Sequence, residues 1–367
     1  MLVQPLKRWD TIIVGQGLAG TTLAWHLLEA GERVLILDPD RPNTASKIAA
    51  GLITPITGQR LALSWRVDEM LAAARAFYAR VERRTGVPFF YPRPAIRLFQ
   101  NDTEREIWAK RRLNDSYVKH LSVPQPDVLL DPAIGDANGG GFQMESGQLD
   151  VAEYLAVSRD HLAVGTAEID WSRDVTFHAD HVAVLGAPAN RVISAEGYAA
   201  TRNPFFAWLP FKGAKGDILT IRFERALSEA AAPATPSECL HRGIWIVPTS
   251  EPHTFRVGAT YDWDNLDDRP SAAGRVEIEE RLRDFIRAPY KVTDHNAAVR
   301  PIIRESKALI GLHPTQARLG FFNGLGSKGA LHAPWFAKTL ADHLLNGSEI
   351  PRDVDLRHRK EAAEYVF

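Results

Sequence analysis

The sequence is short of cysteine and of any excess charge. Its 367 residues include one cysteine, Cys239, which excludes an internal disulfide framework, a multi-cysteine metal cluster and an iron–sulfur site. Lys and Arg number 44 against 45 Asp and Glu, so the formal net charge is −1 and no basic excess favours binding to a nucleic-acid backbone. Hydrophobic residues at 45% and charged residues at 24% are typical of a globular protein.

Long apolar runs are also missing. No stretch reaches the roughly 18 apolar residues that a membrane-spanning helix needs, and residues 1–8 lack the apolar core of a secretory signal. We therefore expect a soluble, cytoplasmic protein. At about 150 residues per domain, the length suggests two domains or one large α/β unit. His178 and His181 lie in a polar segment, where histidines are usually solvated, and we expect no metal site.

A glycine-rich turn near the amino terminus is the first strong motif. Residues 11–14 form a β-branched run that predicts a buried strand. This run leads into Gly15-Gln16-Gly17-Leu18-Ala19-Gly20, a G-x-G-x-x-G pattern, and then into a helical segment that Gly31 would end. A second predicted strand, residues 33–37, ends at Asp38.

This order of strand, glycine turn, helix, strand and acid is typical of a dinucleotide-binding unit. Gly15 would make the tight turn, Gly17 would let a pyrophosphate approach the backbone, and Gly20 would let helix and strand pack closely. The phosphates would meet the free N–H groups at the start of the helix. The Asp38 carboxylate would accept hydrogen bonds from a ribose, which disfavours the 2′-phosphate of NADP.

Two further segments favour FAD over NAD. Residues 44–55 offer small side chains and bare backbone, as a loop that lines a flavin requires, although an ordinary Gly/Ala connector is the alternative; the candidate residues there are Ala45, Ser46, Gly51 and Leu52. Near the carboxyl end, a predicted strand over 319–323 leads into Gly324-Leu325-Gly326-Ser327-Lys328-Gly329 and a predicted helix over 330–345. The start of this helix would stabilise negative charge at the N1–C2=O edge of a reduced flavin, and Lys328 would add positive charge.

The chain resembles the D-amino-acid-oxidase superfamily of FAD-dependent oxidoreductases. The resemblance covers nearly the whole chain and follows the family's order, through Gly15–Gly20, Ala45–Gly51, Lys215–Leu219, Val257–Thr260, Arg300–Gly311 and Gly324–Gly329. Two branches are similar: the glycine oxidases, and the FAD domain of a bifunctional enzyme that matures 5-methylaminomethyl-2-thiouridine in tRNA. The stretch 299–305 resembles the second branch more.

The resemblance implies an α/β fold in which a Rossmann-like FAD-binding domain is interleaved with a smaller, mainly antiparallel substrate domain. The FAD-binding domain would collect residues 1–88, 145–212 and 297–367, and the substrate domain residues 89–144 and 213–296. By the same resemblance, the strand that ends near Gly197 would close over the FAD pyrophosphate. Local patterns add strands over 243–248 and 254–258 and a helix over 275–286.

The resemblance also implies a reaction and its residues. The enzyme would oxidise the C–N bond of an amino acid, an N-substituted glycine or a secondary amine by hydride transfer to flavin N5, and water would hydrolyse the imine. Arg300 matches the arginine that binds a substrate carboxylate in the family, with a structural ion pair as the alternative. Trp245 stands where glycine oxidases have a tyrosine and would form an aromatic wall, unless it belongs to the core. Lys328 would assist reduction of O2, unless it is a solvated lysine.

Several weaker expectations complete the picture. Trp65, Arg66 and Arg97 are minor candidates for the pocket. The Gly324–Gly329 turn contains no cysteine or histidine, and Lys47 stands where a histidine often follows the serine, so FAD would be bound non-covalently. The electron acceptor would be O2 or another oxidant.

Two other functions stay open at this point. One is a tRNA wobble-uridine modification enzyme that removes a carboxymethyl group by the same flavin chemistry. The near-neutral charge of the chain favours a small-molecule substrate over a nucleic-acid partner. The other is a non-catalytic FAD-binding module that serves as an assembly partner.

Overall fold

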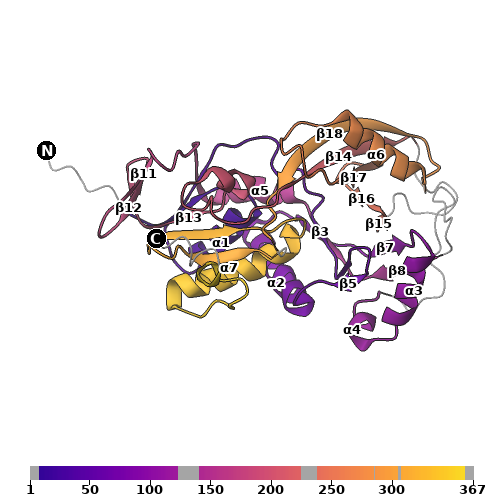
Figure 1. The fold of residues 1–367 in the computed structure, drawn as a ribbon, viewed down its shortest axis with the longest axis horizontal. Helices are drawn as coiled ribbons and strands as arrows, with labels where there is room; N and C mark the ends of the chain where they lie inside the picture. Colours follow the sequence, from indigo (N-terminus) through magenta and orange to yellow (C-terminus); the bar gives the residue numbers. More distant parts are fainter. Residues whose placement is uncertain (1–7, 123–139, 225–237, 285, 305–306, 360–367) are drawn as a thin grey trace.

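A computed structural model describes five stretches of the chain: residues 8–122, 140–224, 238–284, 286–304 and 307–359. Parts of the predictions lie outside these described residues: 1–7 and 360–367 of the FAD-binding domain, 123–139 and 225–237 of the substrate domain, residue 285 of the predicted helix, and 305–306 of the arginine-containing motif. Figure 1 shows two lobes, a helix-covered sheet that contains β13 (Ala187–Ser194) and a second sheet that contains β14 (Ala214–Phe223) and β18 (Tyr290–Arg300). The predicted α/β class, with a mainly antiparallel second sheet, is confirmed.

The first lobe is built on a sheet whose central strands are parallel. These strands lie in the order β10 (Ala163–Thr166), β2 (Val34–Asp38), β1 (Trp9–Val14), β13 (Ala187–Ser194) and β20 (Leu319–Asn323). Antiparallel strands complete the sheet, namely β12 (Val182–Val184) beside the first half of β13, β11 (Val175–Phe177) beyond it, and β19 (Leu309–Leu312) beside β20. Parallel strands that are covered on both faces read as continuous apolar runs, which is the pattern of β1.

The two faces of this sheet enter different cores, because side chains alternate along a strand. Ile13 of β1 packs with the helices, whereas Ile12 and Val14 pack on the opposite face. The helical face carries α1 (Leu18–Glu29), α2 (Val67–Thr85), α5 (Val151–His161) and α7 (Gly329–Asn346). The predicted first and last helices are confirmed. Gly31 follows α1 with a φ of +90°, and Gly347 ends α7 with a φ of +70°, as glycine allows.

A seven-stranded sheet forms the second lobe. Its order is β18 (Tyr290–Arg300), β14 (Ala214–Phe223), β17 (Thr254–Gly258), β16 (Ile244–Pro248), β15 (Cys239–Arg242), β7 (Ala95–Leu98) and β8 (Gly141–Met144). Neighbouring strands are antiparallel except β15 and β7. Helix α6 (Ala272–Arg283) packs on one face and begins three residues before the predicted start, because the Ser271 hydroxyl caps it by accepting the Gly274 N–H at 3.0 Å.

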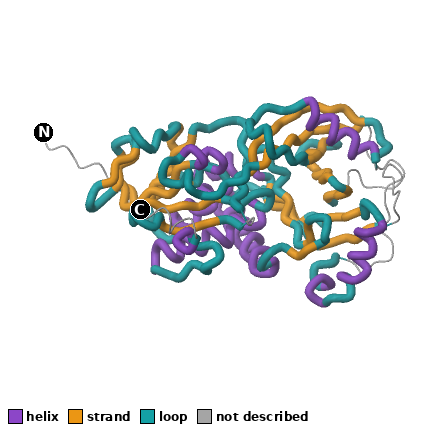
Figure 2. Tube along the Cα trace, in the orientation of Figure 1, coloured by secondary structure: helices purple, strands orange, loops and turns teal. Residues whose placement is uncertain are grey.

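Shorter elements lie between and beside the two sheets (Figure 2). They are β3 (Leu52–Ile53), β9 (Gly147–Leu149) and β6 (Phe90–Pro92) in one small sheet, the pair β4 (Ile56–Thr57) and β5 (Ala62–Leu63), and the helices α3 (Asp102–Arg111) and α4 (Asp115–Val118). The domain boundaries stay a prediction, which this distribution of strands between two sheets supports. Over the described residues, no helix combines the length and apolar character needed to cross a membrane.

The packing of α7 generates a prediction about stability. Phe336 is 1% exposed and its ring packs against Trp65 and Trp335, so Phe336→Ala should cost about 3–5 kcal/mol of unfolding free energy. Leu345 on the same helix is 37% exposed, and Leu345→Ala should change stability by about 0.5 kcal/mol or less. Thermal and urea denaturation midpoints measure both variants. Equal midpoints for the two would contradict this account of the core.

Candidate active site

A cavity of about 2000 Å³ lies between the two sheets. On the side of the first lobe it is lined by both glycine-rich turns and by the loop that contains Ser46. On the other side it is lined by residues of β14, β15, β16, β17 and β18, among them Trp245 and Arg300. The predicted site residues Gly15, Gly17, Leu18, Ala19, Asp38, Ala45, Ser46, Gly51, Leu52, Gly197, Gly326, Ser327, Lys328 and Gly329 also line it.

The first glycine turn connects β1 directly to α1. A Cβ on Gly20 would overlap the carbonyl oxygen of Gly15, so this glycine lets the helix pack against the turn. A Cβ on Gly17 would meet only the Ser46 side chain, with Oγ at 3.0 Å. Gly17 therefore leaves open space on the cavity side, as the approach of a pyrophosphate requires. Gly20 does not line the cavity and acts through packing alone.

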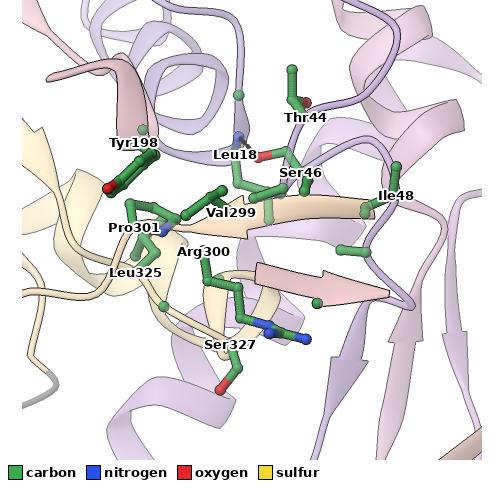
Figure 3. A pocket seen from close by; sticks show the side chains of 18 of the residues that line it. Leu18, Thr44, Ser46, Ile48, Tyr198, Val299, Arg300, Pro301, Leu325 and Ser327 are labelled. Carbon is green, nitrogen blue, oxygen red and sulfur yellow. Dashed lines mark hydrogen bonds between the residues drawn. The ribbon is translucent and has the colours of Figure 1, made fainter. Parts of the chain in front are cut away.

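The Ser46 hydroxyl faces the start of α1. It accepts the Leu18 N–H at 3.1 Å, and Figure 3 shows Ser46 turned towards Leu18. A hydroxyl and several main-chain N–H groups then stand together at the positive end of a helix, which suits an anionic phosphate. The geometry fits a dinucleotide here.

Asp38 has a second role besides the predicted contact with a ribose. Its Oδ2 accepts the Gln16 N–H at 2.7 Å and its Oδ1 accepts the Asp40 N–H at 2.7 Å. Each carboxylate oxygen can accept a further hydrogen bond. The acid therefore holds the first turn against the end of β2 and still faces the cavity.

Gly51 is required by chain packing. Its φ is +70°, and a Cβ would overlap the Leu149 carbonyl of β9. The predicted role of bare backbone around a flavin stays a prediction for this position. Leu52, the next residue, begins β3 and lines the cavity.

The second glycine turn brings α7 to the same place as α1. Gly324 and Gly326 have φ values of +84° and +58°, and a Cβ on Gly329 would lie 2.9 Å from Leu18 Cδ1. The N-termini of two helices therefore meet at one wall of the cavity. Gly324 itself faces Ile303 and shapes the turn without lining the cavity.

Gly197 stands opposite the second turn, just after β13. Its φ is +59°, and its carbonyl accepts a hydrogen bond from Asn323 Nδ2 at 2.8 Å. The strand that ends here is β13, as predicted near this glycine. This hydrogen bond links the end of β13 to the end of β20 at the rim of the cavity.

Lys328 lies at the second turn with its ammonium directed at a hydroxyl. Its Nζ donates to Ser64 Oγ at 3.1 Å. Burial lowers the pKa of the Lys328 ammonium from its usual value. Among the described residues, no carboxylate forms an ion pair with it.

Arg300 ends β18 and reaches into the cavity region below Pro301 in Figure 3. Its Nη1 donates to the Thr260 carbonyl at 3.1 Å and, at the 3.5 Å limit, to the Ala214 carbonyl. Within the described parts of the chain, Arg300 forms no direct ion pair, and Nε and Nη2 make no hydrogen bond, but the buried Asp217 carboxylate lies near enough to act on the guanidinium electrostatically. Burial lowers the pKa of this guanidinium, which is the sign of a desolvated cation.

The second sheet presents a row of side chains as the opposite wall. Trp245 of β16 pairs with Gly258 of β17 and with His241 of β15, and His241 pairs with Arg97 of β7. The Trp245 and His241 rings lie 4.4 Å apart. Burial, with a smaller contribution from Arg97, holds the pKa of His241 well below its usual value, so this histidine is neutral.

Arg97 contributes little free charge to this wall. It forms a buried ion pair with Glu104, and its Nη2 donates to the Gly58 carbonyl at 3.0 Å. Trp65 and Arg66, the other minor candidates, do not line the cavity, so that prediction was wrong. The Trp65 ring packs on Trp335 at 5.7 Å, and Arg66 lies over the same Trp335 ring.

Sequence reasoning missed His241 and Tyr261, which also line the cavity. His241 is recognisable only through its register with Trp245. Tyr261 follows the Val257–Thr260 motif, but nothing in that motif indicates that its ring covers Arg300, with the Arg300 Cζ 4.3 Å from the ring centre.

Comparisons with known proteins agree with this geometry. The sequence profile of the family described as FAD dependent oxidoreductase (DAO) matches residues 10–343. The chain is 24% identical over 357 residues to a glycine oxidase of Bacillus licheniformis, covering 92% of this chain and 94% of that protein. The crystal structure of glycine oxidase from Geobacillus kaustophilus is similar with a TM-score of 0.76 at 21% identity, covering 94% of this chain and 96% of that one.

A longer relative matches as well. The chain is 26% identical over 340 residues to the tRNA 5-methylaminomethyl-2-thiouridine biosynthesis bifunctional protein of Maricaulis maris. The match covers 91% of this chain and 52% of that protein, so the chain spans about half the length of this relative.

The open space at Gly17 generates a prediction about the cofactor. Gly17→Val should leave the fold intact, because the new side chain meets only the end of Ser46, but it should fill the space of the pyrophosphate and give colourless protein. Gly165→Val on β10 is the matched control, since its Cβ also meets one side-chain atom at 3.0 Å, on Leu37, outside the cavity. Flavin released by acid precipitation measures the FAD content of each variant.

The same assay tests the mode of attachment. Wild-type protein should release its flavin into the supernatant, since the second glycine turn contains no cysteine or histidine. Normal flavin content in Gly17→Val would refute the role of this turn. Flavin that stays with the precipitated polypeptide would refute non-covalent binding.

Proposed function

The chain belongs to the family of FAD-dependent oxidoreductases, and from this premise we propose that it oxidises the C–N bond of an amino acid or an N-substituted glycine. Its cofactor is FAD, and bound FAD supplies the chemistry by accepting a hydride from the carbon next to the amine. Water then hydrolyses the imine product. The relative named glycine oxidase supports an amine substrate with a carboxylate group.

One observation carries the choice of substrate: Arg300 is a buried cation that hydrogen-bonds only to carbonyl groups and forms no direct ion pair among the described residues, although the nearby Asp217 carboxylate acts on it electrostatically. Buried charges in proteins are normally paired, because the loss of hydration is costly. Two carbonyl groups use Nη1 and leave Nε and Nη2 available. A carboxylate fits a guanidinium with two parallel hydrogen bonds, so a substrate carboxylate would complete this site.

The chain's other residues have roles that follow from their positions. The start of α1, with Gly17 and Ser46, would hold the pyrophosphate, and the start of α7 would face the flavin edge that becomes negative on reduction. Trp245 and the neutral His241 form a wall that keeps water from the reacting carbon and adds no charge there.

Lys328 adds positive charge at the second glycine turn without a paired acid in the described chain. A cation beside the flavin site would stabilise the negative charge that develops when O2 accepts electrons. We therefore assign Lys328 to the oxidative half of the reaction, with O2 or another acceptor as the oxidant.

A tRNA substrate is the second candidate, because the chain matches the tRNA-modifying relative over 91% of its own length. The same arginine would then bind the carboxymethyl group of a modified uridine. An anaerobic screen separates these functions from a non-catalytic module. Small amino acids and N-substituted glycines should bleach the long-wavelength flavin absorbance under the present proposal, whereas carboxymethylated tRNA alone should do so under the alternative. If neither substrate bleaches the flavin, the non-catalytic FAD-binding module is the remaining hypothesis.

The unpaired guanidinium generates a prediction about activity. Arg300→Met should lower the rate of flavin reduction at subsaturating amino acid by about 30-fold or more, because a desolvated charge partner typically contributes about 2–5 kcal/mol. FAD content and the thermal midpoint should stay near wild type, since the dinucleotide turns lie elsewhere. Anaerobic stopped-flow absorbance measures the reduction rate.

The control for this variant is the corresponding amine without a carboxylate. Its reduction rate should be nearly unchanged by Arg300→Met, although it starts lower in wild type. Equal losses for both substrates, or no loss for either, would show that Arg300 is a structural residue and that the substrate class is wrong.

The placement of Lys328 generates a prediction about reoxidation. Lys328→Met should slow the reaction of reduced enzyme with O2 by about tenfold or more, since each 1.4 kcal/mol of lost stabilisation is tenfold in rate. Lys328→Arg keeps the charge and should recover most of the rate. Flavin reduction by the amine should change much less in both variants, as measured by stopped-flow absorbance. Unchanged reoxidation in Lys328→Met would exclude this role.

A further inference from the structure

We propose that Tyr261 is a positioning residue for Arg300, and that its ring and the bare backbone of Gly216 form a slot that holds the guanidinium ready for a carboxylate. The inference rests on the proposed function, in which Arg300 binds the substrate carboxylate. It adds the residues that fix the orientation of that arginine.

The floor of the slot is a glycine on the neighbouring strand. In the ladder between β14 and β18, Arg300 lies opposite Ala214, and Ala298 lies opposite Gly216. The Arg300 side chain crosses this ladder and covers Gly216, because a Cβ there would lie 2.5 Å from the guanidinium Cζ. Any side chain at position 216 would therefore displace the guanidinium.

The roof of the slot is an aromatic ring. The Arg300 Cζ lies 4.3 Å from the centre of the Tyr261 ring, within the range of a cation–π contact. Tyr261 is 50% exposed, as is its neighbour Trp263 at 44%. The contact with Arg300 gives a reason for this exposed position.

Tyr261 is itself supported by two further side chains. Its ring stacks on Trp263 at 6.0 Å, and Lys212 Nζ lies 4.7 Å from the centre of the Trp263 ring. Contacts therefore continue from Arg300 through two rings to a second cation. A ring that is held in this way restricts the orientations of the guanidinium.

The segment that carries Tyr261 is anchored to β14 on both sides of Gly216. The Lys215 N–H donates to the Asp262 carbonyl at 2.8 Å, the Asp262 N–H donates back at 2.9 Å, and Lys215 Nζ pairs with Asp267 at 2.6 Å. On the other side, the buried Asp217 carboxylate accepts the Ser271 N–H at 2.8 Å. The backbone N–H of Asp217 donates to the Thr260 hydroxyl at 2.9 Å. Floor and roof of the slot are thus fixed to one strand.

This arrangement leaves the useful edge of the guanidinium available. The Tyr261 ring lies over the group, the Gly216 backbone lies close to it, and the Thr260 and Ala214 carbonyls occupy Nη1. Nε and Nη2 stay available for the two oxygens of a carboxylate. An arginine already held in its binding orientation loses less side-chain freedom when the ligand arrives, which raises affinity.

The test measures carboxylate binding directly in the FAD-loaded protein. Glycolate, in which a hydroxyl replaces the amine of glycine, is the probe, and glycolamide is its uncharged counterpart; calorimetry and the shift of the flavin spectrum report binding. Tyr261→Ala should weaken glycolate by about 3- to 30-fold, the range expected for loss of a cation–π contact in a desolvated site. Tyr261→Phe should stay within about twofold of wild type, because the ring remains.

Two further variants separate positioning from general damage. Tyr91→Ala removes a matched Tyr–Arg contact, with Arg93 Cζ 5.4 Å from the ring centre, away from the cavity, and should not change glycolate affinity. Gly216→Ala should weaken glycolate at least as much as Tyr261→Ala while FAD content stays normal. With an amino-acid substrate, Tyr261→Ala should raise KM and leave kcat within about twofold, since the arginine still binds once the site is saturated.

The outcomes distinguish this inference from the proposed function. If glycolate binds wild type but not Arg300→Met, and Tyr261→Ala binds like wild type, the positioning role is overturned while the substrate class stands. Equal weakening of glycolate and glycolamide in Tyr261→Ala would also overturn it. If wild-type protein does not bind glycolate, the proposed function fails and this inference fails with it.

Discussion

The cavity depends on one packing constraint: the starts of helices α1 and α7 must lie close together beside the first glycine turn. Gly20 allows α1 to pack on the Gly15 carbonyl, and Gly329 allows α7 to begin against Leu18. The positive ends of both helix dipoles therefore face the same cavity wall, an arrangement that would suit the phosphates of a dinucleotide and the negative charge of a reduced flavin. A side chain at Gly20 would push α1 away from the Gly15 turn, and a side chain at Gly329 would push the start of α7 away from Leu18, so both helix starts depend on glycine.

The cations around the cavity differ in whether they form ion pairs within the protein. Several cations around the cavity are already neutralised, as Arg97 is by Glu104 and Lys47 is by Asp40. An ion pair that is complete within the protein has little to gain from an external anion. Arg300 and Lys328 form no such ion pair among the described residues, a property that they share with Arg202, Arg242 and Arg256 of the cavity lining. Arg300 lies at the wall formed by the second sheet and Lys328 at the second glycine turn, so the proposed binding of a carboxylate and the proposed stabilisation of the reduced cofactor fall at separate places.

The parts of the site that could be predicted from the sequence are those made by neighbours in the chain. The first turn, its helix and its second strand are all encoded between residues 9 and 38, where glycine spacing and apolar periodicity act over a few positions. The helix after the second turn is likewise encoded by neighbouring residues, with Gly347 at its end. Arg300 and Trp245 came from resemblance to a family, and the structure places both at the cavity. Asp38 shows the limit of the pattern, because its hydrogen bond to Gln16 N–H has no signature in the spacing.

The parts that could not be predicted depend on contacts between distant strands. Trp65 and Arg66 have the chemistry of pocket residues, yet their position relative to α7 directs them onto Trp335, a contact that no local pattern encodes. Gly216 has meaning only through its register with Ala298, which brings the Arg300 side chain over it. A shift of that register by one residue would turn Arg300 to the other face of the sheet, away from Tyr261 and from the cavity. Local patterns therefore predict the two glycine turns of the cavity, whereas the pairing of β14 with β18 determines where the Arg300 guanidinium lies.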